Sequence, residues 1–277
     1  MNINHLNYQS AKLRLKYFQM FIAANQGHPG AVFSQADLLC YLFYNNKINF
    51  KSQDRSERDK IIISKGHSTM GLYPILSDFG YFDSSELENF GKPNSLLKIF
   101  GNISIPGIDA TSGSLGHGVG IGSGYAIFDK NFNKDLLTFV IISEGEMYEG
   151  SVWEAALFAS ENKLDNLILI LDRNHKIILG DTEDSVSLEP IDKKWESFGF
   201  DVSKCNGHDF NSIDESFKII HNKNFKPKII IADTVKGKGI DFMENDPKWH
   251  YWNGVDDQLA KATLVKLKNN IEQHANT

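Results

Sequence analysis

Oxygen-bearing side chains follow two apolar segments near the middle of the sequence. Glu144-Gly145-Glu146 comes directly after one apolar run, and Asp172-Arg173-Asn174 follows the next. If both runs are neighbouring parallel strands, their polar residues meet at the carboxyl edge of one sheet. Carboxylate, amide and carbonyl oxygens suit a hard cation such as Mg²⁺ or Ca²⁺, and a diphosphate needs such an ion to offset its charge. Acidic and Asn residues are also common turn formers at strand ends, so this pair alone leaves both interpretations open.

Gly145 has a different expected task from its acidic neighbours. A glycine lets the backbone come close to a bulky anion. The helix expected to start near Glu149 or Gly150 would also direct unpaired backbone N–H groups toward such an anion. The sequence therefore predicts a metal-bridged anion site at this edge of the sheet.

The elements that must position these residues alternate between helix and strand. Residues 136–142 and 167–171 are continuous apolar runs, typical of strands buried on both faces of a parallel sheet, and residues 150–162 between them have helical spacing. Such a unit crosses over right-handed. Further strands are expected at 61–63 and 228–232. Further helices are expected at 11–24, from a cap at Ser34 through 44, from near Met70, from Ser84, through the Gly-rich stretch 112–124 to 127, and at 256–270.

These elements predict an α/β fold: a doubly wound, mostly parallel sheet flanked by helices, forming one domain over residues 1–277. The net charge of −6 and the absence of a long basic cluster argue against nucleic acid and anionic membranes as partners. Two cysteines, Cys40 and Cys205, support neither a disulfide framework nor a cysteine-ligated zinc site. The polar start of the chain and the lack of a long apolar stretch favour a cytoplasmic protein.

The two polar loops and their neighbours resemble the thiamine-diphosphate motif of transketolases. The motif is carried by residues 144–150, 153–156, 163–167 and 172–174. Further segments agree in order along nearly the whole chain: Gly27-His28-Pro29-Gly30, Ser64-Lys65-Gly66-His67, Gly113-Ser114-Leu115-Gly116, residues 236–239 with 242–245, and Trp249-His250. Several ordered motifs are more specific than any one of them.

The resemblance implies roles for particular residues. Glu144, Asn174 and the backbone carbonyl of Lys176 correspond to the metal ligands of the family. His28, His67 and His250 correspond to histidines that line the cofactor and substrate channel. The cofactor-binding set implied by the resemblance is His67, Leu115, Gly116, Gly145, Glu146, Glu149, Asn174 and His250, with Glu149 also near the subunit interface.

Imidazole suits the proton transfers that this chemistry needs. Its ordinary pKa near 6.5 lets it donate or accept a proton at neutral pH, as proton movement on sugar hydroxyls requires. Outside this motif context, each histidine would be interpreted as an ordinary surface or loop residue.

Three departures from the family pattern qualify the assignment. Glu144, preceded by Ser143, replaces the usual Gly-Asp, so the carboxylate lies one methylene further from the backbone. Residues 98–102 replace a Gly-His-Pro whose histidine lines the channel. His117 stands where the family has Gln, so it either substitutes for the missing catalytic imidazole or fills the same hydrogen-bonding position. These departures leave the substrate, and less strongly the metal, open.

The resemblance also implies a partner and a reaction. Thiamine diphosphate supplies the carbon–carbon bond chemistry, and the protein positions it and moves protons. The family's activating glutamate lies in a following domain that finds no counterpart after Thr277. We therefore expect the chain to be the N-terminal subunit of a split transketolase, paired as α2β2 with a C-terminal pyrimidine-binding subunit. The expected reaction transfers a two-carbon ketol unit from a phosphorylated ketose to an aldose.

Two rival functions remain at this point. The α subunit of a 2-oxo acid dehydrogenase shares the metal loop, but it lacks the Gly-His-Pro-Gly and Lys-Gly-His elements present here. A non-catalytic scaffold of the same fold would explain the altered ligand and the missing histidine. Binding of thiamine diphosphate with magnesium separates the scaffold from the enzymes.

Overall fold

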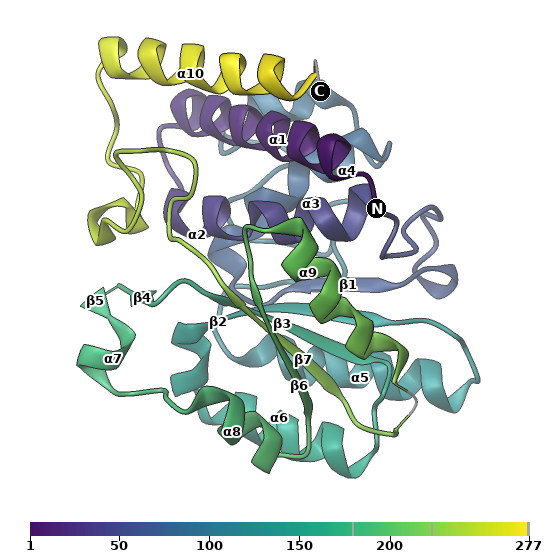
Figure 1. The fold of residues 1–277 in the computed structure, drawn as a ribbon. Coiled ribbons are helices and arrows are strands. Elements are labelled where there is room, and N and C mark those ends of the chain that lie inside the picture. Colours follow the sequence, from purple (N-terminus) through teal and green to yellow (C-terminus); the bar gives the residue numbers. More distant parts are fainter. Residues whose placement is uncertain (179, 223, 276–277) are drawn as a thin grey trace.

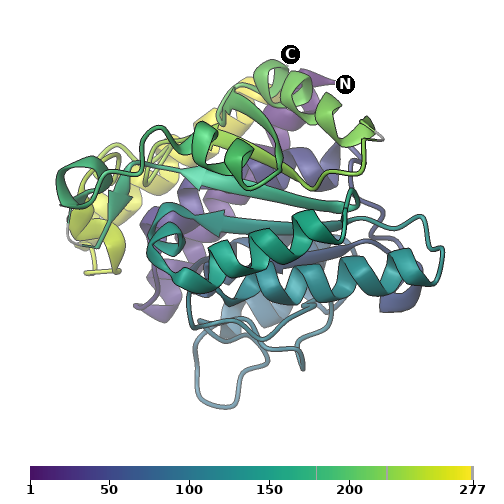
Figure 2. The same cartoon turned by 90° about the horizontal axis from the view of Figure 1, so that it is seen from below.

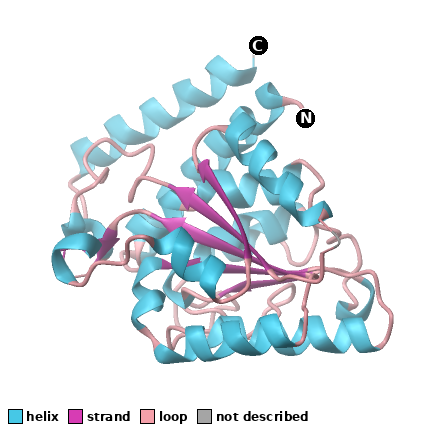
Figure 3. Ribbon diagram, turned by 60° about the horizontal axis from the view of Figure 1, so that its bottom comes forward, coloured by secondary structure: helices cyan, strands magenta, loops and turns pink. Residues whose placement is uncertain are grey.

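A five-stranded parallel sheet forms the centre of the protein. The computed structural model describes residues 1–178, 180–222 and 224–275. Within them the sheet has the order β1 (Lys60–Ile63), β2 (Thr138–Ser143), β3 (Leu167–Arg173), β7 (Lys228–Asp233) and β6 (Asp201–Asn206). Figure 3 shows these strands as a twisted fan between layers of helices. Strand order therefore differs from chain order, as in other doubly wound sheets.

Alternating side chains of the strands face two separate cores. Ile61, Phe139 and Ile141 lie in one buried cluster, while Ile62 and Val140 lie in the other. This alternation is the two-residue period of a strand. Because both faces are covered, the central residues of β1, β2, β3 and β7 are apolar without interruption.

Helices cover both faces of the sheet (Figure 1). The face of Ile62 carries α5 (His117–Asn131), α6 (Gly150–Glu161) and α8 (Ile191–Ser197), and Figure 2 shows α5 and α6 side by side. The opposite face carries α3 (Ala36–Tyr44) and α9 (Phe210–Phe217). Outside them lies α1 (Ile3–Ala24), against which α10 (Asp257–Ala275) packs.

Short elements complete the chain, and several of them surround the carboxyl edge of the sheet. They are α2 (Pro29–Ser34), η1 (Arg55–Glu57), η2 (Gly66–Leu72), α4 (Tyr73–Asp78), η3 (Ser84–Asn89), η4 (Glu144–Tyr148), β4 (Lys176–Ile177), β5 (Gly180–Asp181), α7 (Thr182–Ser185), η5 (Lys218–His221) and η6 (Pro247–His250). Strands β4 and β5 pair as an antiparallel hairpin.

The predicted fold class is confirmed, and so are the strands expected from apolar runs. One helix boundary was wrong: Ser34 is the last residue of α2, and α3 follows from Gln35, so Ser34 does not cap the second helix. Helix α1 also begins at Ile3, earlier than expected. The single-domain assignment over residues 1–277 stays a prediction. Among the described residues, no helix is long and apolar enough to cross a bilayer.

Candidate cofactor site

A cavity of about 470 Å³ opens beyond the carboxyl ends of the strands. The register of the sheet creates it, because Ser143 pairs with Asp172 and Arg173 pairs with Asp233, so three strands end level with one another. The cavity is lined by His28, Ala31, Lys65, His67, Phe100, Gly113, Leu115, Ser143, Gly145, Tyr148, Glu149, Asn174, Lys176, Ile177, Ile178, Lys236, His250 and Tyr251. It therefore lies where open α/β sheets bind their ligands.

Three histidines from distant parts of the chain form a triangle on the cavity wall. His28 precedes α2, His67 lies in η2 and His250 ends η6. Their ring centroids are 5.2 Å apart for His28 and His67, 5.5 Å for His28 and His250, and 5.6 Å for His67 and His250. The structure thus brings together three of the four histidines proposed from the sequence.

Burial keeps these imidazoles neutral at physiological pH. Desolvation, with a contribution from nearby Lys236, lowers the pKa of His28 and of His250 to about 4. Desolvation also lowers the pKa of His67 well below its ordinary value. Neutral imidazoles present one donor and one acceptor nitrogen each, which suits hydrogen bonding to sugar hydroxyls.

Lys236 is a cation in direct contact with this triangle. Its Nζ lies 3.1 Å from Nδ1 of His250. Burial lowers the pKa of Lys236 to about 8, so the amine still carries its charge at neutral pH. A charged ammonium beside the cavity suits an anionic group of a ligand.

Glu144 lies next to the cavity but is not part of its wall. Its side chain is 1% exposed, and its Oε1 accepts hydrogen bonds from Arg173 Nη1 at 3.1 Å and Thr182 Oγ1 at 3.3 Å. Its Oε2 accepts the backbone N–H of His175. Burial raises the pKa of Glu144 to about 7, although Arg173 opposes the rise. The carboxylate of Glu144 is therefore directed to Arg173, Thr182 and the backbone N–H of His175.

Asn174 and Lys176 reach the cavity itself. Both line it, and Asn174 Oδ1 accepts the backbone N–H of Lys176 at 3.2 Å. Together with Glu144 they supply a carboxylate, an amide and a carbonyl oxygen. This donor set fits Mg²⁺ or Ca²⁺. Residues 1–178, 180–222 and 224–275 contain no cluster of three His, Cys, Asp or Glu side chains suited to a metal, so any metal here needs the amide and the carbonyl.

Glu146 fastens three elements around the cavity. Its buried carboxylate accepts hydrogen bonds from the Ser64 hydroxyl, from Gly116 N–H at 3.0 Å and from Ser143 N–H at 2.9 Å. Gly116 has φ 84°, and a Cβ there would lie 2.7 Å from Cβ of Glu149, so glycine is required. Burial raises the pKa of Glu146. Glu146 and Gly116 thus shape the site from behind its wall.

The remaining proposed residues divide between the cavity and its surroundings. Leu115, Gly145 and Glu149 line the cavity. His117 is exposed at the start of α5 and lines a neighbouring hollow of about 260 Å³. It therefore lies outside the triangle of His28, His67 and His250.

Two buried networks behind the cavity were missed in the sequence. Asp172 forms an ion pair with Lys65 and accepts hydrogen bonds from the hydroxyls of Ser34 and Thr234. Burial alone would raise the pKa of Asp172, but Lys65 and these hydrogen bonds hold it below its ordinary value. The sequence signal that could have revealed this pair was Lys65, which belongs to the Lys-Gly-His motif.

The second network positions the segment that carries Lys236. His208 Nε2 accepts the backbone N–H of Val235 at 2.8 Å, so its Nδ1 carries the proton and donates to Asp37 at 2.7 Å. Arg14 holds the same carboxylate. No spacing in the sequence relates these residues, because they come from α1, α3 and two loops.

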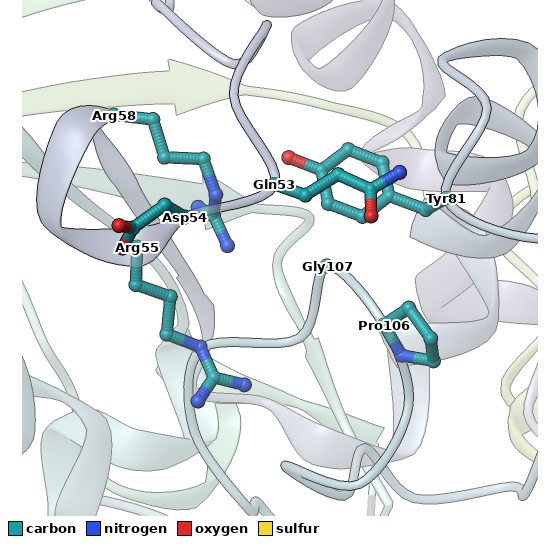
Figure 4. Close-up of a pocket in the computed structure, with 7 residues that line it drawn as sticks. All are labelled: Gln53, Asp54, Arg55, Arg58, Tyr81, Pro106 and Gly107. Carbon is teal, nitrogen blue, oxygen red and sulfur yellow. The ribbon is translucent and has the colours of Figure 1, made fainter.

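A hollow near the opposite, amino end of β1 is occupied by structural pairs. Figure 4 shows Arg55 and Arg58 lining this hollow together with Gln53, Tyr81 and Pro106. Arg58 makes a bidentate ion pair with buried Asp109, and Arg55 donates to the backbone carbonyls of Ile103 and Ile108. These arginines therefore hold a loop, and the chemistry lies at the carboxyl edge.

Comparison with known proteins agrees with this geometry. Residues 9–267 match the family model "Transketolase, thiamine diphosphate binding domain". The chain belongs to the transketolase family. It is 35% identical over 274 residues to a subunit of the apulose-4-phosphate transketolase of Phocaeicola vulgatus, covering 99% of this chain and 97% of that one. It is 36% identical over 267 residues to human transketolase, covering 94% of this chain but 42% of the human protein.

A solved transketolase has the same fold. The Campylobacter jejuni enzyme superposes with a TM-score of 0.86 at 29% identity, covering 100% of this chain and 48% of that one. The chain thus spans about half of a single-chain transketolase and nearly all of a relative named as a subunit. The resemblance drawn from the sequence motifs is confirmed.

Proposed function

We propose that this protein is the N-terminal subunit of a cytoplasmic split transketolase, transferring a two-carbon ketol unit from a phosphorylated ketose to an aldose. A separate pyrimidine-binding subunit completes the enzyme as α2β2. The observation that carries the proposal is the triangle of neutral histidines on the cavity beside Asn174 and Lys176. The names of the subunit relatives support the two-chain arrangement.

Thiamine diphosphate, when bound through Mg²⁺ or Ca²⁺, would supply the carbanion chemistry of the reaction. Glu144, Asn174 and the carbonyl of Lys176 would hold the ion, and the room beside Gly145 would admit the diphosphate. Lys236 attracts the anionic groups. His28, His67 and His250 bind sugar hydroxyls and exchange protons at their oxygens, acting as neutral donors and acceptors because their pKa values are low.

Exposed apolar side chains on α5 and α6 support a protein partner. Leu157 on α6 is 60% exposed, and Phe158, Ile121 and Phe128 on α6 and α5 are exposed as well. We call these four residues the α5/α6 face. Large apolar side chains gathered on adjacent helices are typical of surfaces that another protein covers. We assign this face to the pyrimidine-binding subunit.

Binding and turnover of the reconstituted complex test the function. Thiamine diphosphate with Mg²⁺ at one hundred times Kd should stabilise the complex by about 2.7 kcal/mol, seen as a rise in Tm. Glu144→Gln, which removes the negative charge of one metal ligand, and Asn174→Ala, which removes one ligand, should each weaken cofactor binding by at least about tenfold. Glu154→Gln on exposed α6 is the matched control and should bind normally.

Different failures identify the two rivals. A complex that never takes up the cofactor would support the non-catalytic scaffold. A complex that binds it, releases carbon dioxide from 2-oxo acids and ignores ketoses would support the 2-oxo acid dehydrogenase subunit.

A further inference from the structure

Two exposed aromatic rings line the cavity close to His28. Phe100 is 43% exposed and Tyr251 is 49% exposed. The centroid of the His28 ring lies 6.0 Å from that of Phe100 and 4.9 Å from that of Tyr251. Both rings line the same cavity as His28. Their exposed apolar area is available to a ligand that enters there.

The backbone around each ring is fixed. The Tyr73 hydroxyl donates to the carbonyl of Lys98 at 2.7 Å, and Ser112 N–H donates to the carbonyl of Gly101 at 3.0 Å, on either side of Phe100. The backbone that carries Phe100 is therefore held in place, which lowers the ordering cost when a ligand binds against this ring.

Tyr251 is held in the same way from the other wall. The N–H of Trp252 donates to the carbonyl of Gly27 at 2.9 Å, and its indole N–H donates to Asn25 at 3.0 Å. These bonds join the segment of Tyr251 to the segment that carries His28. The spacing of the ring of Tyr251 from His28 is therefore built into the fold.

The positive charges of the cavity lie away from its exposed rim. Among its described lining residues, the exposed side chains are Phe100, Tyr148, Glu149, Ile178 and Tyr251, and none is a cation. The lysines lie deeper and have partners: Lys65 pairs with Asp172, Lys176 with Asp181, and Lys236 contacts His250. The rim that this chain supplies therefore suits carbon-bound hydrogens better than a phosphate.

The His28 ring, which lies close to both aromatic rings, carries one polar atom that needs a partner. Nδ1 of His28 is buried and has no hydrogen-bond partner within the described part of the chain. A buried polar atom without a partner is costly, so a ligand hydroxyl that reached it would be favoured. The rim thus combines two apolar surfaces with one position for a hydroxyl.

We infer that Phe100 and Tyr251 form an aromatic subsite that binds the C–H face of the sugar and selects acceptors whose outer end is deoxygenated. The inference rests on the proposed ketol transfer and adds the substrate class. The rings contact the apolar face of the sugar, and His28 binds one of its remaining hydroxyls. A hydroxyl placed against Phe100 finds no partner there and loses its water.

Acceptor preference in the reconstituted complex tests this subsite. The probes are 5-deoxy-D-ribose and D-ribose, with a ketose donor that the complex accepts. The wild type should show the higher kcat/KM for the deoxy sugar. Phe100→His supplies a donor and should shift the ratio toward D-ribose on the order of tenfold. Phe100→Leu, which keeps an apolar side chain without the ring, should raise KM for the deoxy sugar about twofold to tenfold with a smaller change in kcat.

Phe225→Leu is the matched control, because Phe225 is an exposed aromatic residue outside the cavity, and it should leave both constants unchanged. Suppose the complex transfers ketol units, the wild type prefers D-ribose, and Phe100→His leaves the ratio of kcat/KM for the two acceptors unchanged. That result would overturn the proposed subsite but not the proposed function. A wild-type complex that neither binds thiamine diphosphate nor acts on any ketose would overturn the proposed function and this inference with it.

Discussion

Replacing Lys236 by Met tests the electrostatics of the histidine triangle. The change removes an ammonium 3.1 Å from Nδ1 of His250 while keeping a side chain of similar length. Lys236 contributes to the low pKa of both His250 and His28, after burial. Its removal should therefore raise both pKa values, and His250 should respond more because it is in direct contact.

The size of the shift follows from the separation. Two unit charges 3.1 Å apart repel each other by at least about 1.3 kcal/mol, the value in the dielectric of water, because Lys236 is buried. That energy corresponds to a pKa change of about one unit. The pKa of His250 should thus rise from about 4 by at least about one unit, and it should stay below its ordinary value near 6.5 because burial remains the larger cause.

Stability should change with pH in a defined direction. The folded pKa of His28 and His250 lies below that of the unfolded chain, so the unfolded chain takes up protons first as pH falls. The stability that these two histidines contribute is fully present above about pH 6.5 and is lost as the pH falls toward 4. In Lys236→Met the free energy of unfolding that is lost on acidification should be smaller by about 1 kcal/mol in total, after allowance for solvent screening.

Histidine NMR titration measures the shift, and urea unfolding between pH 4 and 7 measures the stability change. Lys238→Met is the matched control, because Lys238 belongs to the same Lys-Gly-Lys-Gly motif but pairs with Glu244 away from the cavity. An unchanged His250 titration in Lys236→Met, or equal shifts in both variants, would refute the reasoning.

Three further outcomes are expected. Gly118→Ala should lower the free energy of unfolding by about 1–3 kcal/mol, because a Cβ at residue 118 would lie 2.3 Å from the side chain of Ser64. Gly120→Ala is the control, because a Cβ there faces open space. Equal unfolding midpoints of the two variants in urea would contradict this expectation. Leu157→Asp should weaken the association with the pyrimidine-binding chain at least about tenfold, measured by calorimetry with circular dichroism as the folding control. Burial raises the pKa of both the Cys40 and Cys205 thiols, the latter to about 11, so native labelling by a disulfide reagent should be slow, and rapid labelling would contradict their burial.

The sheet was predictable where burial leaves a continuous pattern in the sequence. Strands β2, β3 and β7 are buried along almost their whole length, and each has an uninterrupted apolar run at its centre, with polar or charged residues at its ends. Strand β6 lies at the edge and mixes Asp201, Ser203 and Lys204 with apolar residues. Its sequence therefore lacks both a continuous apolar run and a clear alternation.

The site was predictable as a set of residues but not in its side-chain directions. Motif order identified His28, His67 and His250, although 183 residues separate the last two. It gave no sign that Glu144 turns to Arg173, because that contact depends on strand register and on one extra methylene. Nor did spacing reveal the aromatic rim at Tyr251.

Three carboxylates are buried at the carboxyl edge of the sheet, and their partners separate their roles. Asp172 and Glu146 are each held by groups from several elements, so turning either one away would leave several donors unpaired. Glu144 likewise accepts from three groups, Arg173, Thr182 and the backbone N–H of His175. It differs in that its charged partner, Arg173, also bonds Glu189. A cation that enters beside Asn174 and recruits Glu144 would therefore leave the guanidinium paired, whereas recruiting Asp172 would take the carboxylate away from Lys65.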